Sequence, residues 1–148
     1  MGEPTDGIER SDLLVHVLAK DPQQPQDEPL IASNINEQLQ HMGLSTWSIS
    51  LQRRVRDALG RLEPKTLLEV GASVGHRTAW MLDLFEREER TLQALTLVEQ
   101  GGKFGVILKR LLQRYDALDW SNVVVGDPER LAAAVSYTHL RAHETSTY

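Results

Sequence analysis

Three short, continuously apolar segments alternate with two amphipathic segments between residues 66 and 125. The apolar segments are Thr66–Val70, Ala94–Val98 and Asn122–Val125, and the helical patterns between them are Arg77–Arg90 and Gly102–Tyr115. Strands with apolar residues at successive positions are typical of parallel sheets covered on both faces, and strands alternating with helices indicate βαβ units. Right-handed crossovers would place the third, second and first strands side by side in that order. The pattern therefore predicts an α/β fold.

Residues 31–65 are expected to form helices that precede this sheet. Apolar residues recur at helical spacing over Asn34–Met42, and Gly43 stands where a helix often ends. A second amphipathic pattern covers Ile49–Arg61. Three basic side chains of the second pattern are expected to face solvent: Arg53, Arg54 and Arg56.

The net charge of −5 is carried by the first thirty residues, which hold seven acidic and two basic side chains. The remaining sequence is balanced, with fourteen of each sign, so its composition requires no nucleic-acid partner. A short helix is expected at residues 12–20, and three prolines in the nine residues 21–29 indicate a linker. We interpret residues 1–30 as an acidic extension with a Pro/Gln linker.

Several classes of protein are excluded by what the chain lacks. It has no cysteine, which excludes disulfide scaffolds, cysteine-based metal sites and thiol catalysis. It has no apolar stretch long enough to span a membrane and no visible secretory signal. We expect a cytoplasmic protein that does not act at a membrane.

Each predicted strand is followed by a group suited to binding a ligand, and open parallel sheets bind ligands beyond the carboxyl ends of their strands. Glu69 and a glycine-rich turn, Gly71–Gly75, follow the first strand, and Glu99 closes the second. Asp127 follows the third strand. Glycine permits a sharp turn and close approach of a ligand, and a carboxylate can accept hydrogen bonds from a ribose or an amino group.

Each of these groups also has an ordinary structural interpretation. Glu69 could be satisfied by neighbouring N–H groups, Glu99 could be a surface acid, and Asp127-Pro128 could simply start a turn. His76 is expected to be a first-turn helix residue rather than a catalytic base. The tryptophans are expected to pack rather than to stack on a ligand: Trp47, Trp80 and Trp120.

Two nucleotide-binding classes share this layout. A dinucleotide fingerprint, G-x-G-x-x-G, would need glycine at the positions of Gly71, Ser73 and His76, which is a poor match. The pattern Glu69-x-Gly71-x-Ser73-x-Gly75 instead resembles the first motif of class I S-adenosylmethionine-dependent methyltransferases. The stretch LLEVGASVGHRTAWM and the later VVVGDPERL look most like the catechol-type O-methyltransferase branch.

The resemblance implies a role for each strand end. The turn with Gly71, Ala72, Ser73 and Gly75 would hold the methionine part of the cofactor, with Glu69 near its amino group. Glu99, followed by Gln100, would bind the ribose hydroxyls, and Asp127 with Pro128 would lie beside adenine.

The chain departs from the family pattern in three places. One is Gln100-Gly101-Gly102 after Glu99, which is looser than usual. Ser73 replaces the middle glycine, which is tolerable if its φ is negative. Pro128 has no N–H to offer adenine.

Residues 135–148 at the end of the sequence do not fit this family pattern. Residues 135–145 resemble, at eleven consecutive positions, the forward translation of a common transposase-based sequencing adapter. The helical spacing of His139 and His143 is therefore not interpreted as a zinc site. We expect residues 135–148 to be a non-native tail and the genuine sequence to be truncated at about residue 134.

The sequence thus predicts the N-terminal half of a doubly wound, Rossmann-like methyltransferase domain. Helices would occupy residues 31–65 and the partial cofactor-binding domain residues 66–134. The intact protein would transfer a methyl group to a small-molecule acceptor, with a divalent metal if it follows the catechol-type branch. No catalytic base and no metal ligand is identified, and we expect the chain as written to be poorly soluble and inactive. The alternatives are an NAD-dependent oxidoreductase and a non-catalytic interaction module.

Overall fold

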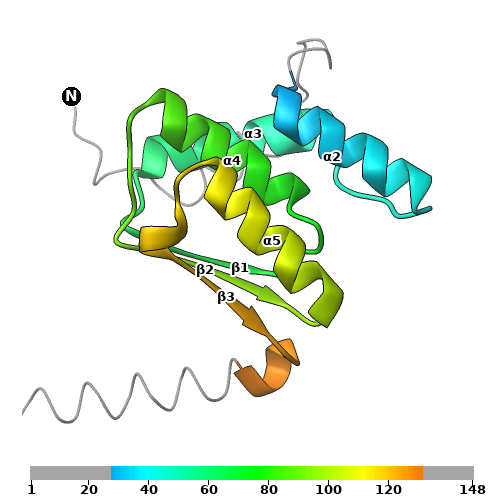
Figure 1. The fold of residues 1–148 in the computed structure, drawn as a ribbon. Coiled ribbons are helices and arrows are strands. Elements are labelled where there is room, and N and C mark those ends of the chain that lie inside the picture. The colour runs from blue at the N-terminus through cyan, green and yellow to red at the C-terminus, as the bar shows by residue number, and fades with distance from the viewer. Residues whose placement is uncertain (1–27, 132–148) are drawn as a thin grey trace, which may run out of the picture.

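A computed structural model describes residues 28–131 of the chain (Figure 1). Its elements in chain order are α2 (Leu30–His41), α3 (Ile49–Leu62), β1 (Thr66–Val70), α4 (His76–Arg87), β2 (Ala94–Glu99), α5 (Gly102–Arg114), the short 3₁₀ helix η3 (Leu118–Trp120) and β3 (Ser121–Val125). The expected helix at residues 12–20, most of the expected linker, the pair of histidines at 139 and 143, and the segment 135–148 lie outside the described residues.

The three strands form one parallel sheet in the order β1-β2-β3, so the predicted α/β fold and strand order are confirmed. In the register of the sheet, Val70 at the end of β1 lies beside Val98, and Glu99 at the end of β2 lies beside Val125. The carboxyl ends of all three strands therefore meet at one edge of the sheet, where the predicted ligand groups are.

Two helix boundaries differ from the predicted ones, and at both the backbone conformation of a flanking residue determines where the helix begins or ends. Helix α2 begins at Leu30 rather than at Asn34, directly after Pro29, whose φ of −58° suits a helix start. Helix α4 ends at Arg87 rather than at Arg90, because Glu89 adopts a left-handed conformation with φ of 51° that stops the helix. Apolar periodicity does not reveal either boundary.

Helices α3, α4 and α5 lie on the same side of the sheet (Figure 1). The core forms between this helical layer and the sheet. Its most deeply buried members include Trp80, Leu82, Phe85, Leu95, Leu97, Leu108 and Leu112. Within residues 28–131, no helix covers the opposite face, whereas the sequence pattern predicted cover on both. Leu68, Val70 and Val125 are accordingly 58%, 49% and 49% exposed.

Helix α3 buries two polar residues, one of which was expected at the surface. Arg53 is only 3% exposed, so its predicted position on a solvent-facing side is wrong. The neighbouring Gln52 is 2% exposed and bonds to a histidine of α4. The spacing of apolar residues identifies the apolar face of a helix, but it cannot reveal a long polar side chain whose aliphatic part is buried.

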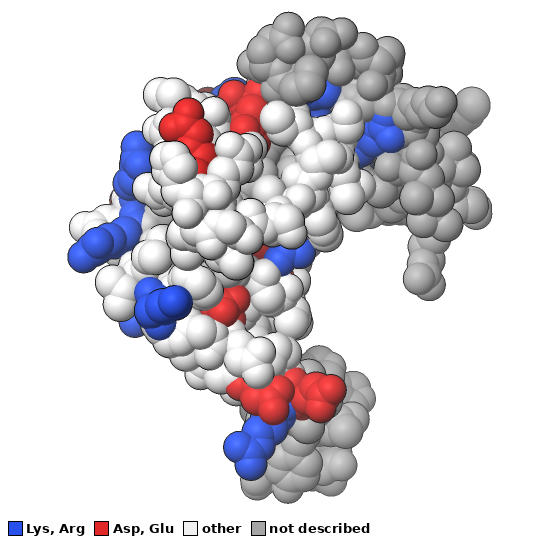
Figure 2. All heavy atoms as spheres, turned by 90° about the vertical axis from the view of Figure 1, so that its right-hand side faces the viewer, with Lys and Arg blue, Asp and Glu red and all other residues white. Residues whose placement is uncertain are grey.

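Acidic and basic side chains are interspersed on the face shown in Figure 2, and neither sign forms a continuous patch there. On α4, Arg87 pairs with Asp83 one turn earlier. This distribution agrees with the balanced charge of residues 31–148.

Candidate cofactor site at the strand ends

The turn between β1 and α4 is built from three residues in left-handed conformations. Gly71, Ser73 and Gly75 have φ values of 77°, 54° and 94°. The condition that Ser73 has a negative φ is therefore not met, and the expectation attached to it is wrong. The turn is held to β2, because the N–H groups of Gly71 and Ala72 both donate to the carbonyl of Val98, at 2.8 and 3.1 Å.

Replacing Ser73 with glycine should stabilise the fold by about 1 kcal/mol, because an L-residue pays about that much in a left-handed conformation and glycine does not. Urea unfolding followed by tryptophan fluorescence would measure it. Ser50→Gly in helix α3 is the matched control, and there the same exchange should destabilise by about 0.5 kcal/mol. A loss of stability in Ser73→Gly would contradict the strain argument.

Glu99 is a buried carboxylate that fastens the turn to the end of β2. Its Oε1 accepts a hydrogen bond from the N–H of Ser73 at 2.8 Å, and its Oε2 accepts one from the N–H of Gly101 at 2.6 Å. The residue is 8% exposed, so it is not a surface acid. Its own carbonyl accepts from the N–H of Gly126 at 3.0 Å, which also connects the end of β3.

Glu69 is the second buried carboxylate at this edge, and it is incompletely satisfied. Its Oε1 accepts from the hydroxyl of Thr78 at 2.6 Å. Its Oε2 is buried without a well-directed hydrogen bond and lies 3.3 Å from Nε of Arg77. Burial raises the pKa of Glu69 above its ordinary value, and the hydrogen bond from Thr78 and the charge of Arg77 do not offset it. The site therefore lacks a donor at Oε2.

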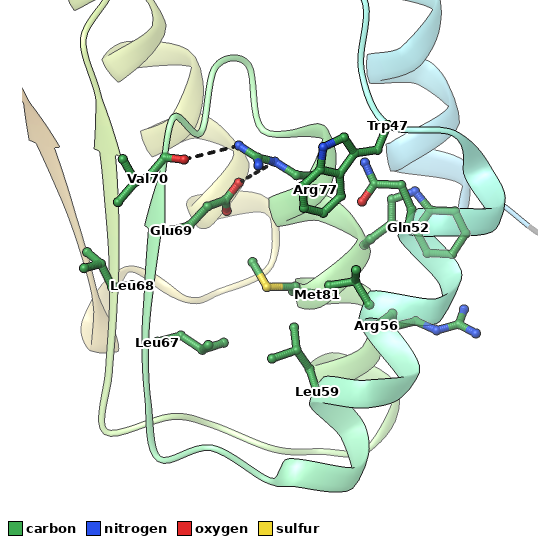
Figure 3. A pocket seen from close by; sticks show the side chains of 12 residues that line it. Trp47, Gln52, Arg56, Leu59, Leu67, Leu68, Glu69, Val70, Arg77 and Met81 are labelled. Atoms are coloured by element: carbon green, nitrogen blue, oxygen red, sulfur yellow. Dashed lines mark hydrogen bonds and ion pairs between the residues drawn. The ribbon is translucent and has the colours of Figure 1, made fainter. Parts of the chain in front are cut away.

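A cavity of about 220 Å³ lies against the turn. It is lined by residues 71–74 with His76 and Arg77, and across from them by Leu39 and the α2–α3 connection, residues 45–47. A second, more apolar cavity of about 250 Å³ lies between α3, α4 and β1 (Figure 3). Trp47 and Arg77 line both cavities, and the guanidinium of Arg77 lies 4.7 Å from the centre of the Trp47 ring.

The remaining predicted residues lie at the same edge but outside the 220 Å³ cavity. Gln100 and Asp127 are exposed, and Pro128 is half-buried. The carboxylate of Asp127 accepts from the N–H of Glu129 at 3.0 Å, and its carbonyl accepts from Leu131. Asp127 therefore caps a helical turn that begins at Pro128.

His76 opens helix α4, as expected, and belongs to a buried polar cluster. Its Nε2 lies 2.7 Å from Oε2 of Glu28, which also accepts from the Trp80 indole at 3.0 Å. Its Nδ1 lies 3.2 Å from the amide nitrogen of Gln52 and 3.1 Å from the hydroxyl of Thr46. The amide nitrogen of Gln52 can only donate, so in this arrangement Nδ1 accepts and Nε2 donates to Glu28.

Arg77 and Glu28 were not among the residues predicted for the site, and Trp47 was expected only to pack. Trp47 is 40% exposed and lies against the guanidinium of Arg77, whereas Trp80, at 1% exposed, is a core residue. Arg77 could have been found from its position directly after the glycine turn. Glu28 gave no signal, because 48 residues separate it from His76.

The described residues contain no group of three acidic, histidine or cysteine side chains able to hold a metal ion. No helix among them is long and apolar enough to cross a membrane.

The sequence matches no protein-family model and no curated protein. The fold does match solved structures. Against the O-methyltransferase TomG of Streptomyces achromogenes, involved in tomaymycin synthesis and solved with S-adenosylmethionine, the TM-score is 0.58 at 13% identity. The match covers 82% of this chain and 50% of that one.

Two further structures show the same fold. A methyltransferase from Geobacter sulfurreducens gives a TM-score of 0.59 at 13% identity, covering 88% of this chain and 63% of that one. A methyltransferase from Podospora anserina, solved with S-adenosylhomocysteine, gives 0.54 at 15% identity, covering 70% and 44%. The chain therefore has the Rossmann-like methyltransferase fold, and it spans about half the length of these proteins.

Proposed function

We propose that the chain carries the cofactor-binding half of an S-adenosylmethionine-dependent methyltransferase that transfers a methyl group to an oxygen of a small molecule. The observation that carries the proposal is the pair of buried carboxylates, Glu69 and Glu99, on either side of the turn Gly71–Gly75. Glu69 lacks a donor at one oxygen, and an amino group is the kind of ligand that supplies one. A cytoplasmic location is part of the same proposal.

The residues present fit this cofactor in three places. The 220 Å³ cavity beside the turn has room for an amino-acid moiety. The incompletely satisfied Glu69 lines the neighbouring 250 Å³ cavity, and Arg77 lines both. Glu99, held in place by Ser73 and Gly101, still has lone pairs for the two hydroxyls of a ribose. Asp127 follows β3 at the same edge of the sheet, and its exposed carboxylate could accept a hydrogen bond from the amino group of a base. When bound, the cofactor supplies an electrophilic methyl group, and the protein would supply alignment.

Binding, rather than turnover, is the test suited to this chain. Isothermal titration calorimetry should show 1:1 binding of S-adenosylhomocysteine and none of NAD⁺ or NADH. Glu99→Gln should weaken that binding about tenfold, because a charged acceptor is replaced by a neutral one. Glu63→Gln, whose side chain is 68% exposed, should leave it unchanged.

The two alternatives are outcomes of the same titration. Binding of NADH without S-adenosylhomocysteine would favour a dinucleotide-dependent oxidoreductase. A folded chain that binds neither ligand would favour an interaction module without a cofactor. The methyl acceptor, any divalent metal and the catalytic base are not assigned to residues of this chain.

A further inference from the structure

Arg77 lines both cavities. It is the cation nearest the incompletely satisfied Glu69, and Figure 3 shows the two side chains in contact. It lies in the first turn of α4 and is 26% exposed at its side chain. Trp47 supports one face of its guanidinium, which holds that planar group in one orientation.

The present contacts of Arg77 leave part of the guanidinium available. Nε faces Glu69, and Nη2 donates to the carbonyl of Gly71. Within residues 28–131, no hydrogen bond or ion pair runs through Nη1. The two N–H groups of Nη1 can therefore donate to an acceptor atom of a ligand in either of the cavities that Arg77 lines.

The pair of Glu69 and Arg77 does not neutralise itself well. The 3.3 Å contact leaves Oε2 of Glu69 without a well-directed hydrogen bond. Burial is the largest influence on the pKa of this carboxyl group and raises it. A ligand carrying an ammonium and a carboxylate on the same carbon atom could donate to Oε2 of Glu69 and accept from Arg77. A diphosphate would satisfy Arg77 but would place its negative charge against Glu69.

We propose that Arg77 receives the carboxylate of the cofactor's amino-acid end, so that Glu69 and Arg77 together select a zwitterionic α-amino acid. This inference rests on the proposed function, because it assigns a residue to the methionine part of that cofactor. Arg77 thereby becomes a residue that determines ligand specificity.

The test compares two ligands that differ in the amino-acid end. S-adenosylhomocysteine carries the zwitterion, and 5′-methylthioadenosine has the same nucleoside and thioether without it. Calorimetry with the full chain should show that Arg77→Gln weakens S-adenosylhomocysteine binding about 10- to 100-fold, as expected for a lost charge-assisted hydrogen bond. Its affinity for 5′-methylthioadenosine should stay within about twofold.

Two further variants separate a binding role from a structural one. Arg77→Lys keeps the positive charge but not the paired N–H donors of the guanidinium. It should therefore bind S-adenosylhomocysteine more tightly than Arg77→Gln and less tightly than the wild type. Arg56→Gln is the matched control, because Arg56 also stacks on a tryptophan, 5.3 Å from the centre of the Trp80 ring, and lines only the apolar cavity. It should change the affinity for neither ligand.

The outcomes distinguish the two proposals. If the wild-type chain binds S-adenosylhomocysteine and Arg77→Gln binds it equally well, the role of Arg77 is refuted and the proposed function stands. Equal weakening of both ligands would also refute it, because Arg77 would then act by supporting the turn. If the wild-type chain binds neither ligand, both proposals fall.

Discussion

Gly75→Ala should lower the free energy of unfolding by about 3 kcal/mol, combining backbone strain with a steric clash. The backbone of Gly75 has φ of 94°, a conformation that a residue with a Cβ adopts at a cost. The added Cβ would lie 2.5 Å from Cδ2 of Leu111 and 3.2 Å from Cδ2 of Leu108. Both leucines are buried in the core of α5, so neither can move away freely.

Two other glycines separate the contributions. Gly43 has φ of 70° but open space around its Cβ position, so Gly43→Ala should show the backbone cost alone, about 1 kcal/mol. Gly60 lies in α3 with an ordinary contact of 3.6 Å to Leu84, and there alanine should stabilise by up to about 1 kcal/mol. Urea unfolding at low protein concentration would rank the three. If Gly75→Ala were no worse than Gly43→Ala, close packing of the turn against α5 would be disproved.

Removing the carboxylate of Glu28 should also destabilise strongly, by about 3 kcal/mol for Glu28→Ala. The side chains of Glu28 and His76 are 6% and 3% exposed, and their contact is 2.7 Å. Alanine would leave two buried donors, on His76 and Trp80, without their acceptor. Glu28→Gln keeps an acceptor oxygen and should recover part of the loss. Glu37→Ala on the exposed side of α2 should change stability by less than about 0.5 kcal/mol.

The same carboxylate should shape the response to acid. Burial acts to raise the pKa of Glu28, but hydrogen bonds from His76, Trp80 and Asn36 act to lower it, and the pKa lies below its ordinary value of 4.5. The unfolded chain therefore takes up the proton first as the pH falls. The stabilisation is complete above pH 4.5 and is lost as the pH falls through the folded-state pKa.

Unfolding experiments between pH 7 and pH 3 would test this sign. The difference in stability between the wild type and Glu28→Gln should be constant at neutral pH and should shrink in acid. A difference that grows as the pH falls would show that Glu28 carries a raised pKa instead.

The sequence was informative wherever one residue type serves one local purpose. Continuous apolar runs predicted the strands, because a parallel strand at the core needs apolar residues at successive positions. The glycine turn and the acids at two strand ends were expected to gather at one edge of the sheet, where the carboxyl ends of parallel strands meet, and the structure brings them together there. The bounds of β1 and the order of the sheet agreed with the prediction.

What the sequence could not reveal depends on contacts between distant residues. Glu28 looked like part of a polar linker, yet it meets His76 and Trp80 across 48 and 52 positions. Arg53 looked exposed because helical spacing records apolar residues alone. Ser73 was expected to be tolerable with a negative φ, but its φ is 54°, and its N–H donates to Glu99, 26 residues further along the chain.

The double anchorage of Glu99 has a thermodynamic consequence. A free glutamate loses about 1.5–2 kcal/mol of rotamer entropy when a ligand fixes it. Here the N–H groups of Ser73 and Gly101 have already fixed the carboxylate, so that entropy is lost when the chain folds and not when a ligand arrives. A diol that binds at this edge would meet a preorganised acceptor. Little further ordering of the protein would be needed, so ordering would cost little of the binding free energy.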